Sequence, residues 1–271
     1  MRPLSPRLLG HFKGWDGRVA PTRDAATIVV LRERAGRLEV FLMRRQASMA
    51  FAGGMHVFPG GGVQESDFDE TVPWAGTPAR EWAERFRCDA RLARALVVAA
   101  VRETFEETGV LLAGPDTATV VEDTRAPGFQ EARTRLEAGD ISFGALLRER
   151  GLVLRADLLG AWAHWITPEF EPRRYDTRFF VALLPKGQSE RGLAGEADRA
   201  LWLPADEAWR QADAGELHMM PPTRHTLRAL RGMTADGVMR EAADRSVTTI
   251  APRLVLVDGV PGLDGPAEDQ I

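Results

Sequence analysis

Residues 102–110 read RETFEETGV. At 3.6 residues per turn, Glu103, Glu106 and Glu107 fall at positions i, i+3 and i+4, so a helix would place three carboxylates on one face. The opposite face is apolar and suited to packing on a sheet, with Val97, Val98, Val101 and Phe105. Gly109 is the residue type that commonly ends a helix. The stretch therefore predicts an amphipathic helix with an acidic cluster near its carboxyl end.

Two interpretations of this acidic cluster remain open at this point. Such a helix face is often simply solvated, with Arg102 as a surface partner of the glutamates. Alternatively, the carboxylates hold a hard divalent cation, which prefers oxygen ligands and bridges carboxylates to substrate phosphates. The upstream residues 58–62, FPGGG, favour the second interpretation. Glycines after a strand let the main chain approach a ligand closely, although they can also form a plain turn.

The rest of the chain mixes strands and helices without a regular βαβ alternation. Strands are predicted at 25–32, 38–44, 55–58, 160–166, 177–184 and 201–204. Helices are predicted at 80–108 (two, broken near Cys88 and Asp89), 128–138, 142–150, 205–214, 222–230 and 235–244, with Thr77, Thr223 and Thr234 as caps. Residues 259–266, rich in glycine and proline, are expected to form a loosely ordered tail. The pattern indicates an α+β layered fold.

Composition excludes several classes of protein. A hydrophobic content of 44% and a charged content of 27% argue against wholesale disorder and fibrous repeats. The longest apolar run, residues 95–101, is too short for a membrane span. The net charge is −4, and the arginines are interspersed with carboxylates, so no nucleic-acid-binding stripe is expected. The lone Cys88 and the lack of a recognisable secretory signal favour the cytoplasm.

Together these residues resemble the box of the Nudix hydrolases, Gly-x5-Glu-x7-Arg-Glu-U-x-Glu-Glu-x-Gly-U, in which U is apolar. The carboxyl half of the box matches residues 102–110, with Thr104 in place of the first apolar residue. The amino half begins at Gly61, and Asp67 stands where the box has glutamate. Residues 68–101 separate Asp67 from Arg102, where the box has only seven residues. The box is therefore split by an insertion, residues 68–94.

In having a long insertion inside the box, the sequence resembles a subgroup of the family that contains coenzyme A diphosphatases of the peroxisomal type. That subgroup also reads Phe-Pro-Gly-Gly ahead of its insertion. The associated pattern Leu-Leu-Thr-x-Arg-(Ser/Ala)-x3-Arg-x3-Gly is half kept: Arg45 and Gly54 fit, but Gln46 and Ala50 do not. The resemblance implies a Nudix-type α/β/α sandwich with a mixed sheet. It also implies one domain, 1–271, with a core at about 22–232, the insertion at 68–94 and a helical extension at about 233–271.

The resemblance also implies roles for individual residues. The metal, Mg²⁺ or Mn²⁺, would be held by Glu103, Glu106, Glu107 and the main-chain carbonyl of Gly61. Arg102 would orient these carboxylates, and Glu196 is a candidate general base. Substrate contacts are expected from Arg45, Gly60, Gly62 and Arg174.

The expected activity is metal-dependent hydrolysis of a small-molecule diphosphate that links a nucleoside to another moiety. Coenzyme A, cleaved to 3′,5′-ADP and phosphopantetheine, is placed ahead of ADP-ribose, NAD(H) and nucleotide sugars. The competing class is a non-catalytic Nudix-fold ligand sensor, and a homodimer is left open. The insertion is expected either to form a wall of the substrate pocket or to be a peripheral addition that only adds stability.

Overall fold

A mixed β-sheet lies at the centre of the protein, whose computed structural model describes residues 2–48, 53–190 and 197–264. The order of its main strands is β11-β3-β2-β10-β9-β12. β2 runs parallel to β10 and antiparallel to β3, and the short β4 and β5 pair with β3 and β2. The bounds are β2 Thr22–Arg34, β3 Arg37–Arg45, β4 His56–Val57, β5 Gly60–Gly62, β9 Leu159–Ile166, β10 Arg174–Leu183, β11 Ala197–Pro204 and β12 Thr249–Ile250.

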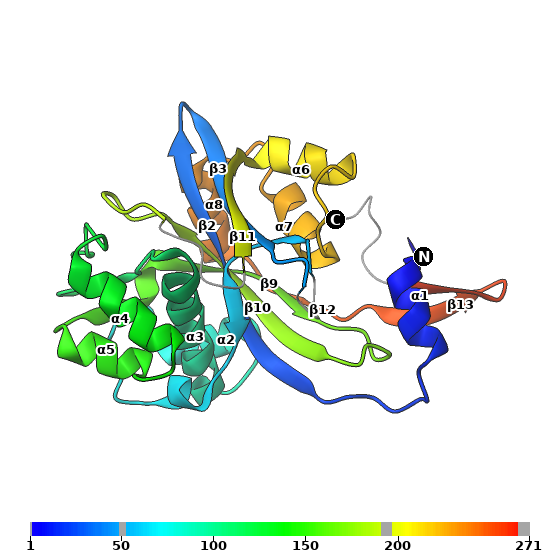
Figure 1. The fold of residues 1–271 in the computed structure, drawn as a ribbon, viewed down its shortest axis with the longest axis horizontal. Helices are drawn as coiled ribbons and strands as arrows, with labels where there is room; N and C mark the ends of the chain where they lie inside the picture. Colours follow the sequence, from blue (N-terminus) through cyan, green and yellow to red (C-terminus); the bar gives the residue numbers. More distant parts are fainter. Residues whose placement is uncertain (1, 49–52, 191–196, 265–271) are drawn as a thin grey trace.

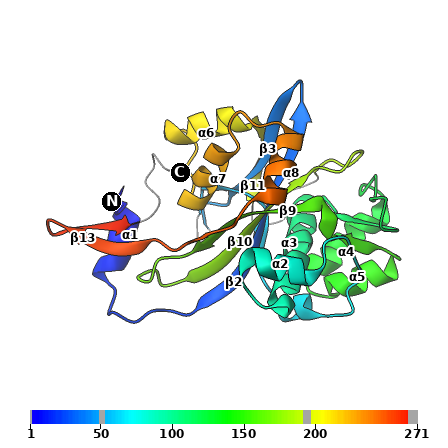
Figure 2. The same ribbon diagram turned by 180° about the vertical axis from the view of Figure 1, so that it is seen from behind.

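Helices cover both faces of this sheet (Figures 1 and 2). One face is covered by α2 Ala79–Phe86 and α3 Ala90–Thr108, and α4 Pro127–Glu137 and α5 Phe143–Glu149 lie on the outer side of α3. The other face is covered by α6 Ala205–Asp213, α7 Pro221–Ala229 and α8 Ala235–Asp244. The predicted α/β/α sandwich with a mixed sheet is therefore confirmed.

The middle of β2, residues 25–31, is apolar except for Thr27. Ile28 and Val30 point into the core beneath α3, whereas Val29 and Leu31 point into the core beneath α7 and α8. Since successive side chains of a strand point to opposite faces, a strand covered on both faces needs apolar residues at every position. β2 thus fixes the relative position of the two helical layers.

The insertion contributes to the main core. Trp82 and Phe86 of α2 are buried, and their ring centroids lie 5.4 and 5.0 Å from that of Phe180 in β10. Ahead of α2, where the sequence predicts no strand, β6, Trp74–Ala75, joins a small sheet with β8, Val153–Arg155, and β7, Ala113–Gly114. The Thr77 cap was wrong, because Pro78 precedes the helix and no side chain caps it.

Replacing Trp82 by alanine should cost about 3–5 kcal/mol of folding free energy, since it opens a cavity in a packed core. Urea denaturation measures this loss. Glu84→Ala is the matched control, because Glu84 lies on the same helix and is exposed. Equal unfolding midpoints for the two variants would show that the insertion is a peripheral decoration.

The chain after α8 departs from the expected helical extension and loose tail. Thr234 caps α8 as predicted, its hydroxyl accepting a hydrogen bond from the Gly237 N–H at 3.1 Å. The chain then forms a hairpin, β13 Arg253–Val257 and β14 Val260–Asp264, and β14 pairs with β1, Arg2–Pro3. The predicted tail was therefore wrong for residues 260–264. The single-domain assignment stays a prediction.

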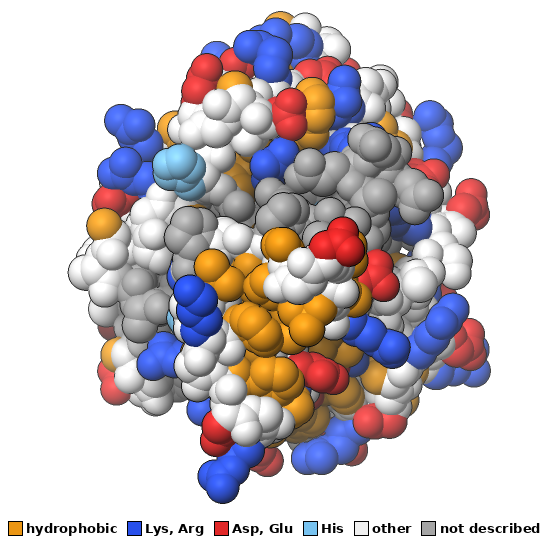
Figure 3. Space-filling model, turned by 90° about the vertical axis from the view of Figure 1, so that its right-hand side faces the viewer, with side chains coloured by type: hydrophobic (Ala, Val, Ile, Leu, Met, Phe, Trp, Pro, Cys, Tyr) orange, Lys and Arg blue, Asp and Glu red, His pale blue; other side chains and the backbone are white. Residues whose placement is uncertain are grey.

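The end of the molecule that carries this hairpin also holds α1, Pro6–Lys13. Figure 3 faces this end and shows hydrophobic side chains gathered near its centre. At the hairpin tip, Leu256, Val257 and Val260 are exposed. None of the helices in the described part of the chain has both the length and the hydropathy of a membrane-spanning segment.

α7 begins at Pro221, one residue before the predicted start of this helix. Met220 precedes it and Pro221 is its first residue, so Thr223 is not its cap. Proline fits this position because the first helical N–H has no partner within the helix. His225 lies in the middle of the helix, with its ring against Trp165.

His225 should make folding stability depend on pH. Its ring packs edge-on against Trp165 at 5.3 Å, and burial, with smaller contributions from Arg245 and Arg228, lowers its pKa from 6.5 to about 4. Because the unfolded chain takes up this proton more readily, the contribution is complete above pH 6.5 and declines as pH falls from 6.5 towards 4. Melting temperatures of His225→Phe should therefore fall less over this range than those of the wild type. The exposed His218, replaced by glutamine, should leave the wild-type curve unchanged.

Candidate active site

α3 holds the acidic cluster in its last two turns. The helix starts after Asp89, whose side chain accepts the Leu92 N–H at 2.8 Å, and it ends at Gly109, which is left-handed with φ 76°. The apolar residues opposite the glutamates are all buried, as predicted, and pack beneath β2: Val97, Val98, Val101 and Phe105. Packing therefore fixes the direction in which Glu103, Glu106 and Glu107 project.

Arg102 lies at the centre of the cluster and is 1% exposed. Its Nη1 donates to Glu103 Oε1 at 2.7 Å and to Glu106 Oε2 at 3.0 Å. Burial alone would lower the pKa of Arg102, but the hydrogen bonds that Arg102 donates to Asp67 and the charges of three carboxylates raise it. The alternative of a solvated acidic face with a surface arginine is therefore wrong.

Asp67 reaches this arginine despite its short side chain. It lies in the 3₁₀ turn η1, Glu65–Phe68, and binds Arg102 through two bonds, Oδ1 to Nε at 2.8 Å and Oδ2 to Nη2 at 2.9 Å. Asp67 Oδ2 also accepts the Gln64 N–H at 2.8 Å. The two-pronged geometry suits a guanidinium and a carboxylate, so this buried pair joins the start of the insertion to α3.

The three glycines form strand β5 rather than a plain turn. The Gly60 N–H donates to Glu107 Oε2 at 2.7 Å, and the Gly62 carbonyl accepts from Arg102 Nη2 at 3.0 Å. A Cβ atom on Gly60 would lie 2.4 Å from the Ala26 carbonyl oxygen, and one on Gly61 would lie 2.5 Å from the Glu103 carboxylate. Gly60 is therefore required for the close approach of β5 to β2, and Gly61 for its close approach to the Glu103 carboxylate, whereas a Cβ atom on Gly62 would meet no other atom within 4 Å.

Burial in the cluster disfavours the charged form of Glu106. The pKa of Glu106 rises to about 7, mainly because the carboxyl is desolvated, with the charges of Glu103 and Asp67 adding to the effect and Arg102 opposing it. Beside it, the buried Arg133 donates to the Glu106 carbonyl at 2.6 Å, which satisfies a free acceptor at the helix end. The site therefore places several carboxylate oxygen atoms next to the glycine main chain of β5.

The oxygen atoms at this site are of the kind that a hard cation prefers as ligands. Three carboxylates and nearby main-chain oxygens are the ligands that Mg²⁺ and Mn²⁺ prefer. Within 2–48, 53–190 and 197–264, however, no three acidic, histidine or cysteine side chains already converge as a metal site. Glu103 and Glu106 turn to Arg102, and Glu107 turns to Gly60. The fit is therefore one of chemistry rather than of ready-made coordination geometry.

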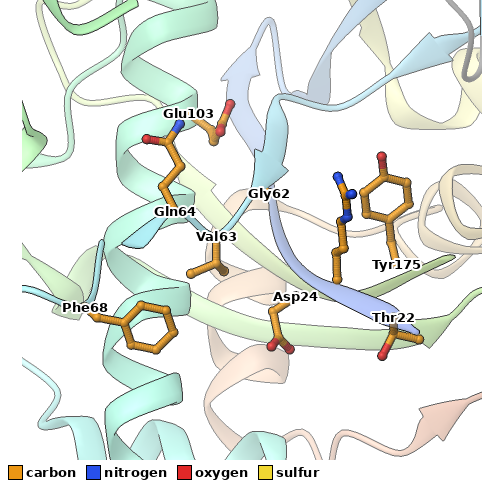
Figure 4. Close-up of a pocket in the computed structure, with 9 residues that line it drawn as sticks. Thr22, Asp24, Gly62, Val63, Gln64, Phe68, Glu103 and Tyr175 are labelled. Atoms are coloured by element: carbon orange, nitrogen blue, oxygen red, sulfur yellow. The ribbon is translucent and has the colours of Figure 1, made fainter. Parts of the chain in front are cut away.

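A pocket of about 560 Å³ opens beside Glu103. It is lined by Thr22, Arg23, Asp24, Gly62, Val63, Gln64, Phe68, Glu103 and Tyr175. Figure 4 shows Glu103 and Gln64 on one side of the pocket, and Tyr175 and Thr22 on the other. The pocket thus leads from the carboxylate helix to the beginnings of β2 and β10. From the insertion only Phe68 lines it, so α2 does not form its wall.

The predicted substrate-binding residues are not all at this pocket. Gly62 lines it, whereas Arg45 lies at the end of β3, where its N–H donates to the Met55 carbonyl. Arg174 donates to two main-chain carbonyls, those of Thr167 at 3.1 Å and Ala20 at 2.8 Å. The predicted base, Glu196, lies outside the described residues.

Sequence reasoning missed other residues near the cluster: Arg23, Tyr175 and Arg133. Arg23 and Tyr175 are partners across the parallel β2–β10 pair. No short-range motif signals such a pairing, because it depends on the register of two strands far apart in the chain. Arg133 lies on a helix of ordinary composition, and nothing in its sequence points to α3.

Comparison with known proteins assigns the family. A family model described as the NUDT19 Nudix domain matches residues 89–230, which is more than half of the chain. A crystal structure of a Nudix hydrolase from Alicyclobacillus acidocaldarius is 32% identical, covering 82% of this chain and 96% of that chain, with a TM-score of 0.71. The fold and the carboxylate helix are those of a Nudix enzyme, and the chain belongs to the Nudix hydrolase family.

Two curated relatives carry a more specific name. Acyl-coenzyme A diphosphatase NUDT19 of Gallus gallus is 26% identical over 257 residues, which covers 78% of this chain and 68% of that protein. The Xenopus laevis protein of the same name is 25% identical over 225 residues, covering 71% and 59%. The match thus spans roughly three-fifths to two-thirds of the length of these relatives. The expectation of a Nudix enzyme is confirmed.

Proposed function

We propose that the protein hydrolyses the diphosphate of coenzyme A or an acylated form of it, releasing 3′,5′-ADP and phosphopantetheine or its acyl derivative. The observation that carries this proposal is the cluster of three carboxylates beside β5, next to a pocket large enough for part of a nucleotide. The buried Arg102 holds Glu103 and Glu106, and the Gly60 N–H holds Glu107. The names of the chicken and frog relatives support coenzyme A as the substrate class.

In this proposal, Glu103, Glu106, Glu107 and the Gly61 carbonyl hold Mg²⁺ or Mn²⁺. When bound, the metal lowers the pKa of a coordinated water and neutralises charge on the phosphates. Arg102 and Asp67 keep the carboxylates in place through the hydrogen bonds described above. The Gly60 N–H, which bonds to Glu107, fixes the third carboxylate against β5.

The reaction is balanced without any further co-reactant. The oxygen of water forms a bond to one phosphorus atom, the bridging P–O bond breaks, and the leaving phosphate departs with the bridging oxygen. A general base must accept the proton of the water. Glu196 remains the proposed base.

Hydrolysis of a panel of diphosphates tests the proposal. The purified protein, treated with EDTA and then supplied with Mg²⁺ or Mn²⁺, should cleave coenzyme A and acyl-coenzyme A with a higher kcat/KM than ADP-ribose, NADH or UDP-glucose. Mass spectrometry should identify 3′,5′-ADP among the products. Each metal should restore the activity that EDTA removes.

Three outcomes would contradict parts of this proposal. Activity that persists in EDTA would exclude the metal assignment. A higher kcat/KM for ADP-ribose or NADH than for coenzyme A would show that the protein acts on those alternative substrates instead. Binding of a diphosphate without turnover of any panel member in either metal would favour the non-catalytic ligand sensor.

A further inference from the structure

Arg23 is an exposed arginine that lines the pocket beside the carboxylate helix. No hydrogen bond or ion pair to another described residue occupies its side chain. Most other arginines close to the site bind a carboxylate or a main-chain carbonyl, as Arg102 and Arg174 do. Arg23 therefore brings a guanidinium to the pocket that is available for a ligand.

The acidic groups of the pocket do not use Arg23. Asp24 pairs with Arg178, whose Nη1 lies 2.7 Å from Asp24 Oδ1. Glu103 pairs with Arg102 at 2.7 Å. Arg23 is thus the only basic side chain among the described residues that line the pocket, and its charge is left for an anion.

Tyr175 stands next to Arg23. The two residues are paired in the parallel register of β10 and β2, so their side chains project from the same face of the sheet. Tyr175 is the single tyrosine of the chain, and Figure 4 shows it across the pocket from Glu103. A planar guanidinium and an adjacent phenol hydroxyl are suitable donors for phosphate oxygens.

This arrangement puts an anion-binding position at the far side of the pocket from the carboxylates. With a diphosphate at the carboxylate helix and its nucleoside directed along the pocket, a second anion on that nucleoside can reach Arg23. We propose that Arg23 and Tyr175 bind a phosphate monoester on the ribose of the substrate. The pocket then selects 3′-phosphorylated nucleoside diphosphates over their unphosphorylated counterparts. The kinetic part of this inference rests on the proposed function.

Coenzyme A and 3′-dephospho-coenzyme A form a matched substrate pair, because they differ only in that phosphate. The wild-type protein should prefer coenzyme A by about 10- to 100-fold in kcat/KM, as expected for a charged hydrogen-bonded contact. Arg23→Gln should remove most of this preference, mainly by raising KM for coenzyme A. Tyr175→Phe should reduce it by a smaller factor.

Arg37→Gln is the matched control for the loss of one positive charge. Arg37 is exposed at the turn between β2 and β3 and does not line the pocket, so its loss should leave the preference intact. A preference lost equally in both variants would indicate long-range attraction of the anion and would overturn the subsite.

A binding measurement separates failure of this inference from failure of the proposed function. By calorimetry, 3′,5′-ADP should bind the wild type more tightly than 5′-AMP does, and Arg23→Gln should bind the two alike. If this holds while neither coenzyme A compound is hydrolysed, the proposed function fails and the phosphate subsite stands. If Arg23→Gln keeps the wild-type ratios in hydrolysis and in binding, the subsite is wrong and the proposed function stands.

Discussion

Replacing Glu107 by glutamine should lower kcat by several orders of magnitude while the protein stays folded. Each factor of ten corresponds to about 1.4 kcal/mol of lost transition-state stabilisation. Glutamine has nearly the same shape as glutamate and keeps a carbonyl oxygen for the Gly60 N–H, which Glu107 now binds at 2.7 Å. It loses the negative charge that a divalent cation requires. Steady-state kinetics in saturating Mg²⁺ or Mn²⁺ measure the effect.

The control for this variant is Glu131→Gln. Glu131 is exposed on α4, so its replacement makes the same chemical change outside the cluster and should leave kcat unaltered. Equal melting temperatures for the two variants would show that the loss of turnover is not a loss of fold. Turnover by Glu107→Gln close to that of the wild type would remove Glu107 from the proposed metal ligands.

The carboxylate helix was accessible from the sequence because its signals are local. The spacing of Glu103, Glu106 and Glu107, the apolar stripe opposite them and the terminal Gly109 all lie within a few helical turns. The interactions that hold those glutamates are not local. Arg102 binds Asp67 from the other end of the insertion, and no spacing rule reveals that the chain between them folds back.

The fold shows the same division between local and long-range information. The helices of both layers were predicted from local signals, whereas their arrangement as a sandwich came from the family resemblance. The glycines of β5 resembled a turn because pairing with β2 is a long-range contact. The carboxyl-terminal hairpin was missed because Pro261 and Gly262 suggest a loop. Asp258-Gly259 was the available signal: both residues have positive φ, 52° and 79°, as in a two-residue hairpin turn.

Asp67 connects the fold of the insertion to the chemistry of α3. It is fully buried, and its partner Arg102 is the residue that binds Glu103 and Glu106. A buried carboxylate is tolerated only when a cation and hydrogen bonds compensate its loss of hydration. The stability of the fold and the orientation of the proposed metal ligands therefore depend on the same arginine.

Arg102→Met should destabilise the fold by about 3–5 kcal/mol, because it leaves Asp67 charged and buried without its partner. Arg102→Lys should also be costly, since an ammonium group cannot reproduce the paired bonds to both Asp67 oxygens at 2.8 and 2.9 Å. Urea denaturation at neutral pH measures both variants. Their kcat should fall as well, because Glu103 and Glu106 lose the donor that orients them.

A double-mutant cycle distinguishes loss of the ion pair from a general packing defect. Asp67→Asn removes the buried charge, so Arg102→Met should cost less in that background than in the wild type, with a coupling energy of about 1–3 kcal/mol. Activity should not recover with stability in the double variant, because Glu103 and Glu106 still lack the Arg102 donor. If the two single effects simply add, Asp67 is not held by Arg102 in solution, and the link between the insertion and the carboxylate helix is lost.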